Sequence, residues 1–182
     1  MAVMEANLGI LTIDQLKTRP ELQYLPDASV QKSIEIRMRD RAPKDLGVTM
    51  ERDRMLLLKA LNGAHARLLF GTDAPELFTV PGFTIYHEMQ LMAAAGMSNY
   101  EILRSATEQA GEYTGKSCGI VKPGACADLI LTDGNPLANL DHPLRLSGVV
   151  LHGRWLSTSD LQRFVKEVRD WPGNYRVPGA AP

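Results

Sequence analysis

One short apolar run constrains the fold of this chain more than any other sequence feature. Leu68, Leu69 and Phe70 lie between a helical segment that ends at Gly63 and the turn-forming sequence that begins at Thr72. The run is too short for a helix, and its lack of polar alternation is typical of a strand covered on both faces. We therefore predict a buried strand at residues 67–71. Helical patterns before and after it indicate an α/β protein with parallel strands, in which ligands bind at the carboxyl ends.

Apolar periodicity and turn signals predict the remaining elements. Helices are expected over residues 28–40, 49–62, 84–95, 98–114 and 158–171, and β segments over residues 127–132, 148–151 and 154–156. Thr49 is the expected N-cap of the second helix. Ser98 and Glu101 form a capping box at the start of the fourth.

Two helices carry a single apolar stripe. The first is expected to bury Val30, Ile34 and Met38, and the last Leu161, Phe164, Val165 and Val168. The densest basic run contains Arg37, Arg39 and Arg41, but Glu35 and Asp40 interrupt it. We interpret this basic run as a solvated helix face.

Composition excludes several classes of protein. The 182 residues carry a formal net charge of -1 and a pI of about 6.4, so nucleic acid is not an expected partner. No run approaches the roughly 18 to 20 apolar residues of a membrane span, so a membrane is not an expected partner either. Residues 1–11 lack the regions of a signal peptide. The cytoplasm is therefore the default compartment, unless a signal lies upstream of Met1.

The two cysteines, Cys118 and Cys126, are too few for a secreted disulfide framework, and their spacing is not that of a zinc pair. We expect two reduced thiols.

Asp73 is the candidate catalytic residue. It follows the predicted strand at its carboxyl end, where α/β enzymes place working groups, between Thr72 and the Ala74-Pro75 pair. A carboxylate held there can serve as a metal ligand or general base. The alternative is an aspartate that caps the loop through hydrogen bonds to the backbone.

The sequence around Asp73 resembles the amidohydrolase superfamily. GTDAP at residues 71–75, VPGF at 80–83, HEM at 87–89 and AAGMS at 94–98 are similar to the last strand, loop and helix of its barrels. Further similar pieces follow in the family's order, namely Ala106-Thr107, Gly115, residues 119–124, ADLIL at 127–131, NPL at 135–137 and residues 149–153. The resemblance is to the imidazolonepropionase-like and prolidase-like subgroup.

The resemblance implies a fold and a division of the chain. The fold would be the C-terminal part of a (β/α)8 TIM-like barrel, followed by part of a small β-sandwich assembled from both chain ends. Residues 1–115 would hold the last barrel helices and the final strand, residues 116–157 the β-sandwich segment, and residues 158–182 a C-terminal helix and tail.

The resemblance also implies a metal centre. Asp73 would be the ligand from the eighth strand, binding a divalent metal, expected to be zinc, and moving a proton from the metal-bound hydroxide to the leaving group. Thr72, Pro75 and His87 would contact the substrate or orient a metal ligand. Zinc catalysis needs about three protein ligands, and the family's HxH pair does not occur here. We therefore expect weak or no metal binding by this chain alone.

The other polar residues with chemical potential are interpreted as structural. His65, His142 and His152 are widely spread, and none matches a ligand position of the family. Asp128 is expected to fix a hairpin.

The function implied is hydrolysis of an amide or cyclic-amide C–N bond, in a dipeptide or another small substrate, by metal-activated water. The chain would be inactive alone, and its partner would be the missing N-terminal barrel half or a second chain. Two alternatives stay open. One is a non-catalytic remnant or interaction module, and the other is a ring deaminase or esterase-type hydrolase of the same family.

Overall fold

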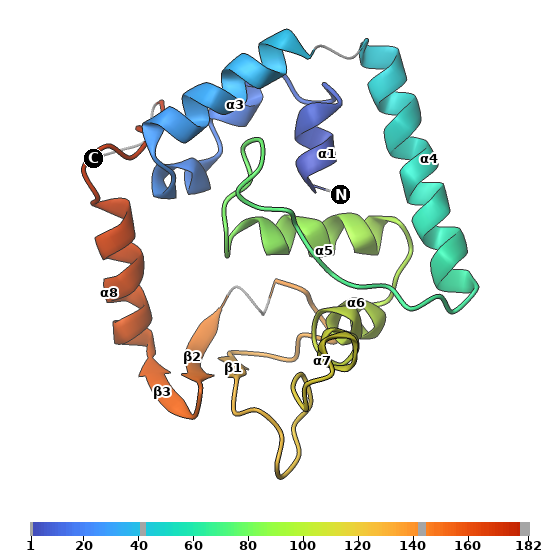
Figure 1. The fold of residues 1–182 in the computed structure, drawn as a ribbon, viewed down its shortest axis with the longest axis vertical. Helices are drawn as coiled ribbons and strands as arrows, with labels where there is room; N and C mark the ends of the chain where they lie inside the picture. Colours follow the sequence, from blue (N-terminus) through green and yellow to red (C-terminus); the bar gives the residue numbers. More distant parts are fainter. Residues whose placement is uncertain (1, 41–42, 142–144, 179–182) are drawn as a thin grey trace. The chain divides into compact units, whose positions relative to one another are not determined.

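The structure is a computed structural model that describes residues 2–40, 43–141 and 145–178 (Figure 1). Its helices are α1 (Ala2–Asn7), α2 (Ile13–Lys17), the 3-10 helix η1 (Pro20–Tyr24), α3 (Asp27–Arg39), α4 (Lys44–Gly63), α5 (Thr84–Ala94), α6 (Asn99–Ala106), α7 (Glu108–Thr114) and α8 (Thr158–Arg169). Its strands are β1 (Leu129–Thr132), β2 (Leu146–Leu151) and β3 (Arg154–Ser157). The chain is therefore α/β, as the sequence predicts. Within the described residues, no helix is both long and apolar enough to cross a membrane.

The chain divides into two compact units. The first comprises residues 1–56, 72–88 and 166–182, and the second residues 57–71 and 89–165. Because several segments alternate between the units, each unit is built from pieces that are distant in the sequence.

The first unit has an apolar core under α1, η1 and α3. Its buried residues are Ala6, Leu16, Leu22, Leu25, Val30, Phe78, Val80 and Tyr175. The Tyr24 and Phe83 rings stack beside it with centroids 4.4 Å apart. Tyr175 N donates a hydrogen bond to Leu25 O at 2.9 Å, so the C-terminal segment is tied to the same core.

The second unit contains a three-stranded antiparallel sheet in the order β1-β2-β3 (Figure 1). The β2–β3 turn uses two left-handed residues, His152 with φ 50° and Gly153 with φ 77°. The carboxylate of Asp128 accepts a hydrogen bond from His152 N at 2.6 Å. Asp128 therefore fixes the hairpin, as the sequence predicts. Gly148 of β2 faces the Trp155 ring, which an added Cβ would meet at 2.0 Å.

Local signals predict most of the helices correctly. The Ser98–Glu101 capping box is present, with both reciprocal hydrogen bonds. Thr107, with φ -126° and ψ -86°, divides the expected helix at residues 98–114 into α6 and α7. The helix expected from Thr49 begins instead at Lys44, so Thr49 is not its N-cap.

The predicted strand at residues 67–71 is not formed. The segment is extended, but among the described residues it pairs with no strand, and Phe70 N donates only a long hydrogen bond to Ser105 O at 3.5 Å. Leu69 is 46% exposed rather than covered on both faces. The physical reason is that a strand exists only through hydrogen bonds to neighbouring strands.

The apolar stripes are also corrected. Helix α3 buries Val30, Ser33 and Arg37, whereas Met38 is 56% exposed. The prediction of a solvated face is therefore wrong for Arg37. Helix α8 buries no residue, so its predicted apolar stripe is not covered by any other part of the described chain.

The two cysteines are bonded to each other rather than reduced. Cys118 and Cys126 form a disulfide with their Cα atoms 4.8 Å apart. Cys126 N also donates a hydrogen bond to Ser117 O at 2.7 Å, so the intervening loop is closed at its base. Sequence spacing cannot reveal this pairing, because it depends on how the loop folds back.

Replacement of Leu22 tests the core of the first unit. We expect Leu22→Ala to lower the free energy of unfolding by about 2–5 kcal/mol, because Leu22 is fully buried and its loss leaves a cavity. Leu56→Ala removes the same atoms from a residue that is 57% exposed. This control should change the free energy of unfolding by at most about 0.5 kcal/mol. Urea unfolding followed by circular dichroism measures both variants. Equal losses would contradict the assignment of this core.

Candidate functional site

Asp73 lies in a tight turn directly after the extended segment at residues 67–71. Its backbone is left-handed, with φ 58°, and its carbonyl accepts a hydrogen bond from Glu76 N at 3.1 Å. The Thr72 hydroxyl accepts from Ala74 N at 3.4 Å. The turn is thus held by main-chain groups and by Thr72.

The Asp73 side chain is exposed, and within the described residues its carboxylate makes no hydrogen bond or ion pair. The sequence allowed an alternative in which this side chain caps the loop, but no such hydrogen bond is formed there. The carboxylate is therefore left accessible to a ligand.

The loop after Asp73 is anchored by three consecutive buried residues. Phe78 is 1% exposed, Thr79 0% and Val80 2%. Phe78 N donates a hydrogen bond to the Ser33 hydroxyl of α3 at 3.4 Å, and Val80 N donates to the Thr84 hydroxyl at 2.7 Å. This packing holds the loop against α3 and against the start of α5.

The backbone of the same loop is strained. Leu77 has φ 36° and Phe78 φ 63°, in the left-handed region that side chains other than glycine rarely adopt. Together with Asp73, three non-glycine residues within six positions adopt this conformation. Such strain persists only where the surroundings over-determine it, and it is often found at functional sites.

His87 of α5 is engaged by an acidic partner. Its Nε2 lies 2.6 Å from a carboxylate oxygen of Glu5, and the same oxygen lies 3.2 Å from the Arg19 guanidinium. The side chains of Glu5 and Arg19 are each 16% exposed, and that of His87 is 35% exposed. Because an ionised carboxylate only accepts hydrogen bonds, Nε2 is the donor.

The hydrogen bond from His87 holds the pKa of Glu5 below its ordinary value of 4.5. Burial of the carboxylate acts in the opposite direction, but the hydrogen bond from His87, together with the attraction to His87 and Arg19, keeps the pKa lowered. Glu5 is therefore a fixed negative charge, and it orients the imidazole ring.

The structure does not join all the residues that the sequence singled out. Among the described residues, no hydrogen bond or ion pair links His87 to Asp73. Thr72 is half-buried and Pro75 is exposed. Of the residues interpreted as structural, His65 is exposed, His152 belongs to the hairpin turn, and His142 lies outside the described residues.

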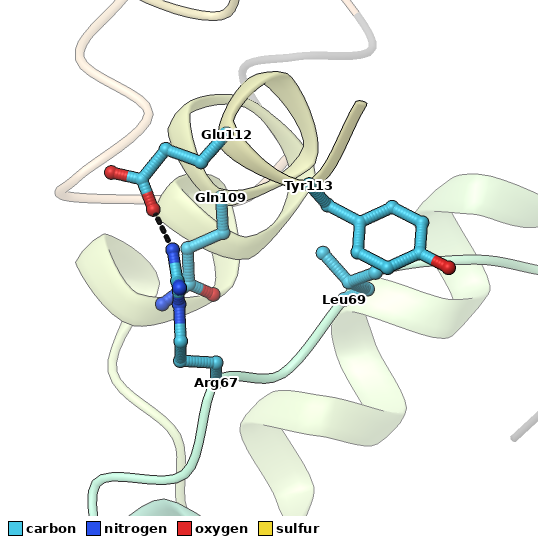
Figure 2. Close-up of a pocket in the computed structure, with 5 residues that line it drawn as sticks. All are labelled: Arg67, Leu69, Gln109, Glu112 and Tyr113. Atoms are coloured by element: carbon cyan, nitrogen blue, oxygen red, sulfur yellow. Dashed lines mark hydrogen bonds and ion pairs between the residues drawn. The ribbon is translucent and has the colours of Figure 1, made fainter. Parts of the chain in front are cut away.

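A shallow hollow of about 220 Å³ lies in the second unit, between residues 67–69 and α7. Figure 2 shows the Arg67 guanidinium reaching Glu112, with which it forms an ion pair, and Leu69 beside the Tyr113 ring. Gln109 completes the lining. The Arg67 side chain is 74% exposed, so the hollow is an open surface feature, and its described lining contains no group of three or more metal-ligating side chains.

The donor atoms in this chain do not form a metal centre. No group of three or more His, Cys, Asp or Glu residues is arranged to hold a metal ion in the part of the chain that the structure describes. A catalytic zinc site needs about three protein ligands and an open position. Asp73 can supply one oxygen donor, but the described residues do not fit a complete centre.

Sequence reasoning missed three charged residues of the first unit. Glu5 and Arg19 lie in segments for which no role was predicted, and Arg37 was assigned to solvent. No local pattern marks Glu5, because its partner His87 is 82 positions away.

Comparison with known proteins identifies what the chain is similar to. The model of the amidohydrolase family matches residues 12–156. Among solved structures, a bottromycin amidohydrolase aligns with a TM-score of 0.71 and 24% identity, over 92% of this chain and 38% of that one. A Xaa-Pro dipeptidase with bound methionine in the active site aligns with a TM-score of 0.54 and 20% identity, over 76% of this chain and 34% of that one. No curated protein matches.

A crystal structure of an amidohydrolase aligns at 26% identity over 57% of this chain, with a TM-score of 0.49. The chain spans only 25%, 38% and 34% of the three solved proteins. The alignments with the bottromycin amidohydrolase and the Xaa-Pro dipeptidase, at 24% and 20% identity, indicate the fold alone. That fold is an α/β fold related to the TIM barrel.

Replacement of Glu5 tests the contact with His87 through its pH dependence. A carboxylate with a lowered pKa contributes stability that is present above its ordinary value of 4.5 and is lost as the pH falls through the lowered pKa. We expect Glu5→Gln to be less stable than wild type at neutral pH. We also expect it to lose less stability than wild type between about pH 5 and about pH 3.

Urea unfolding across this pH range measures the difference. Asp14→Asn is the matched control, because the Asp14 side chain is 95% exposed, and it should keep the wild-type pH profile. An unchanged profile for Glu5→Gln would contradict the role of Glu5.

Proposed function

This chain belongs to the amidohydrolase family, and on that premise we propose that it is the C-terminal part of a metal-dependent hydrolase of amide or cyclic-amide C–N bonds. The observation that carries the proposal is the family match over residues 12–156, which includes the GTDAP sequence around Asp73. The bottromycin amidohydrolase and the Xaa-Pro dipeptidase, two structural neighbours, are named for action on amide or peptide bonds.

Asp73 is the proposed catalytic residue and metal ligand. The support is its position directly after residues 67–71, its exposed carboxylate without a partner among the described residues, and the strained, anchored loop that follows. Thr72, Pro75 and His87 are proposed to contact the substrate or to orient a metal ligand. Thr72 shapes the turn through its hydroxyl, and His87 is oriented by Glu5.

The metal is proposed to be zinc. A divalent metal lowers the pKa of bound water and so supplies the nucleophile of such enzymes. Because the described residues form no group of three or more metal-ligating side chains, the remaining ligands are proposed to come from outside them.

A partner polypeptide is proposed to complete the fold as a barrel with a small β-sandwich. Residues 67–71 leave strand hydrogen bonds unmade, which is a liability unless another strand covers them. Large apolar side chains are also exposed on α4, β1 and α8, namely Leu46, Val48, Leu56, Leu57, Ile130, Leu131, Phe164, Val165 and Val168. The proposed occupant of these surfaces is the N-terminal barrel part, on the same longer polypeptide or on a second one.

The proposed substrates are small molecules that contain an amino acid joined through an amide, such as dipeptides. The support is the similarity to a Xaa-Pro dipeptidase whose structure has methionine bound in the active site. Ring deamination and ester hydrolysis are the alternatives within the family. A panel of dipeptides, cyclic amides, amino-substituted rings and esters distinguishes them.

Zinc titration distinguishes a metal site that needs ligands from elsewhere from a metal site that is complete within this chain. We expect the 182-residue chain to bind zinc weakly and to hydrolyse no dipeptide, because one carboxylate cannot form a three-ligand centre. Isothermal titration with zinc chloride and an amine-release assay measure both. Tight stoichiometric zinc together with turnover would overturn the prediction.

Asp73→Asn tests the catalytic assignment in a complete assembly. This assembly is either the longer protein, if the coding sequence continues in frame upstream of Met1, or the complex of this chain with a second polypeptide. We expect kcat to fall by about 10²- to 10⁴-fold, the range for loss of a general acid or base. Asp14→Asn is the matched control and should keep full activity. A fully active Asp73→Asn would remove Asp73 from the chemistry, and a complete assembly without any hydrolase activity would favour the non-catalytic alternative.

A further inference from the structure

Arg37 is a buried cation on helix α3. Only 8% of the residue is exposed, and its Nε atom is buried without a hydrogen-bond acceptor. No ion pair or hydrogen bond to its guanidinium is formed within the described residues. Its neighbour Arg39 behaves as the sequence predicts, since it is exposed and pairs with Asp40 at 2.9 Å.

Burial of a charge without a partner is costly, and native proteins avoid it unless a counter-charge or a function compensates. The chain could avoid the cost by a small rotation of α3, since Met38 is apolar and 56% exposed. The helix instead buries Arg37 and exposes the methionine. An anion supplied from outside the described residues would resolve this arrangement.

Two largely buried carboxylates of the first unit are engaged by other groups. Glu88 accepts a hydrogen bond from Ala2 N at 2.7 Å, and Glu5 is held by His87 and Arg19. Neither is positioned by these contacts to neutralise Arg37. A third carboxylate, that of Glu51, pairs with Arg54 at 2.8 Å through one oxygen, while its other oxygen is buried without a hydrogen-bond partner. Because no hydrogen bond or ion pair joins Glu51 to Arg37 among the described residues, the anion is expected from outside them.

The position of Arg37 connects it to the loop that carries Asp73. Arg37 lies one helical turn, about 5–6 Å along the axis, beyond Ser33 on the same buried face of α3. The Ser33 hydroxyl accepts the hydrogen bond from Phe78 N in that loop. All three residues belong to the first unit, so their arrangement does not depend on how the two units are placed.

We infer that Arg37 is the anchor for a carboxylate group of a small-molecule substrate. A guanidinium presents a planar fork of donors that matches a carboxylate in a bidentate geometry, and a desolvated fork strengthens that pair. This inference rests on the proposed function, because dipeptides and N-acyl amino acids both carry a free carboxylate. It adds a binding residue, and it limits the substrates to those with an acidic end.

The test is a binding experiment that needs no turnover. The 182-residue chain is titrated with N-acetylglycine, with the uncharged analogue N-acetylglycinamide and with inorganic phosphate, by isothermal calorimetry and by thermal unfolding. We expect N-acetylglycine to bind and to raise the unfolding temperature, the amide to have no effect, and phosphate to bind more weakly. Arg37→Met should weaken N-acetylglycine binding by about tenfold or more, while Arg39→Met should leave it unchanged.

A second readout distinguishes a ligand anchor from a structural arginine. Without ligand, Arg37→Met should unfold at a higher urea concentration than wild type, because it replaces an unpaired buried charge with an apolar side chain of similar length. Destabilisation by this variant, equal binding of the amide, or tighter binding of phosphate would each overturn the inference.

The outcome is separable from the proposed catalytic role. Carboxylate binding that depends on Arg37 and survives Asp73→Asn supports the anchor even if no hydrolysis is found. Hydrolysis that depends on Asp73 but not on Arg37, with no carboxylate response, overturns the anchor and leaves the proposed function intact.

Discussion

The candidate site depends on the burial of Phe78, Thr79 and Val80 in the core of the first unit. These three residues fix the loop that begins at Asp73, and they do so from the middle of the loop rather than from its ends. Burial of two large apolar side chains is a strong, non-directional force that can hold unfavourable backbone conformations nearby. The left-handed residues Asp73, Leu77 and Phe78 are tolerated for that reason. Without this anchor, the position of the Asp73 carboxylate would not be defined.

Two buried arrangements of charge in the same unit illustrate opposite solutions to desolvation. Glu5 lies between His87 and Arg19, so its negative charge is compensated at hydrogen-bond distance on two sides. Arg37 has no such compensation among the described residues, although it is more deeply buried. The first arrangement is complete within the chain, and it serves to orient an imidazole. The second is incomplete, which is what a binding group requires before its ligand arrives.

The sequence determined those features whose causes are local. The capping box at Ser98 and Glu101 closes over three residues, and the hairpin turn at His152-Gly153 follows from a glycine and from the nearby Asp128 carboxylate. The extent of α3 follows from apolar periodicity, and that of α5 from the turn-forming residues before it and from Gly96 after it. The sequence around Asp73 also carried the family resemblance, which the match over residues 12–156 confirms. Local hydrogen bonds and short-range packing encode all of these directly.

Only the tertiary structure decided which partners distant residues find. The run at residues 67–71 has the composition of a covered strand, but a strand needs neighbours, and the described chain provides none for it. Helix α3 was predicted correctly, yet the buried face includes Arg37 rather than Met38, because the face is selected by the loop packed against it. The Cys118–Cys126 bond likewise depends on how its loop folds back. Side-chain partners far along the chain are set by burial and geometry in three dimensions, which no local pattern encodes.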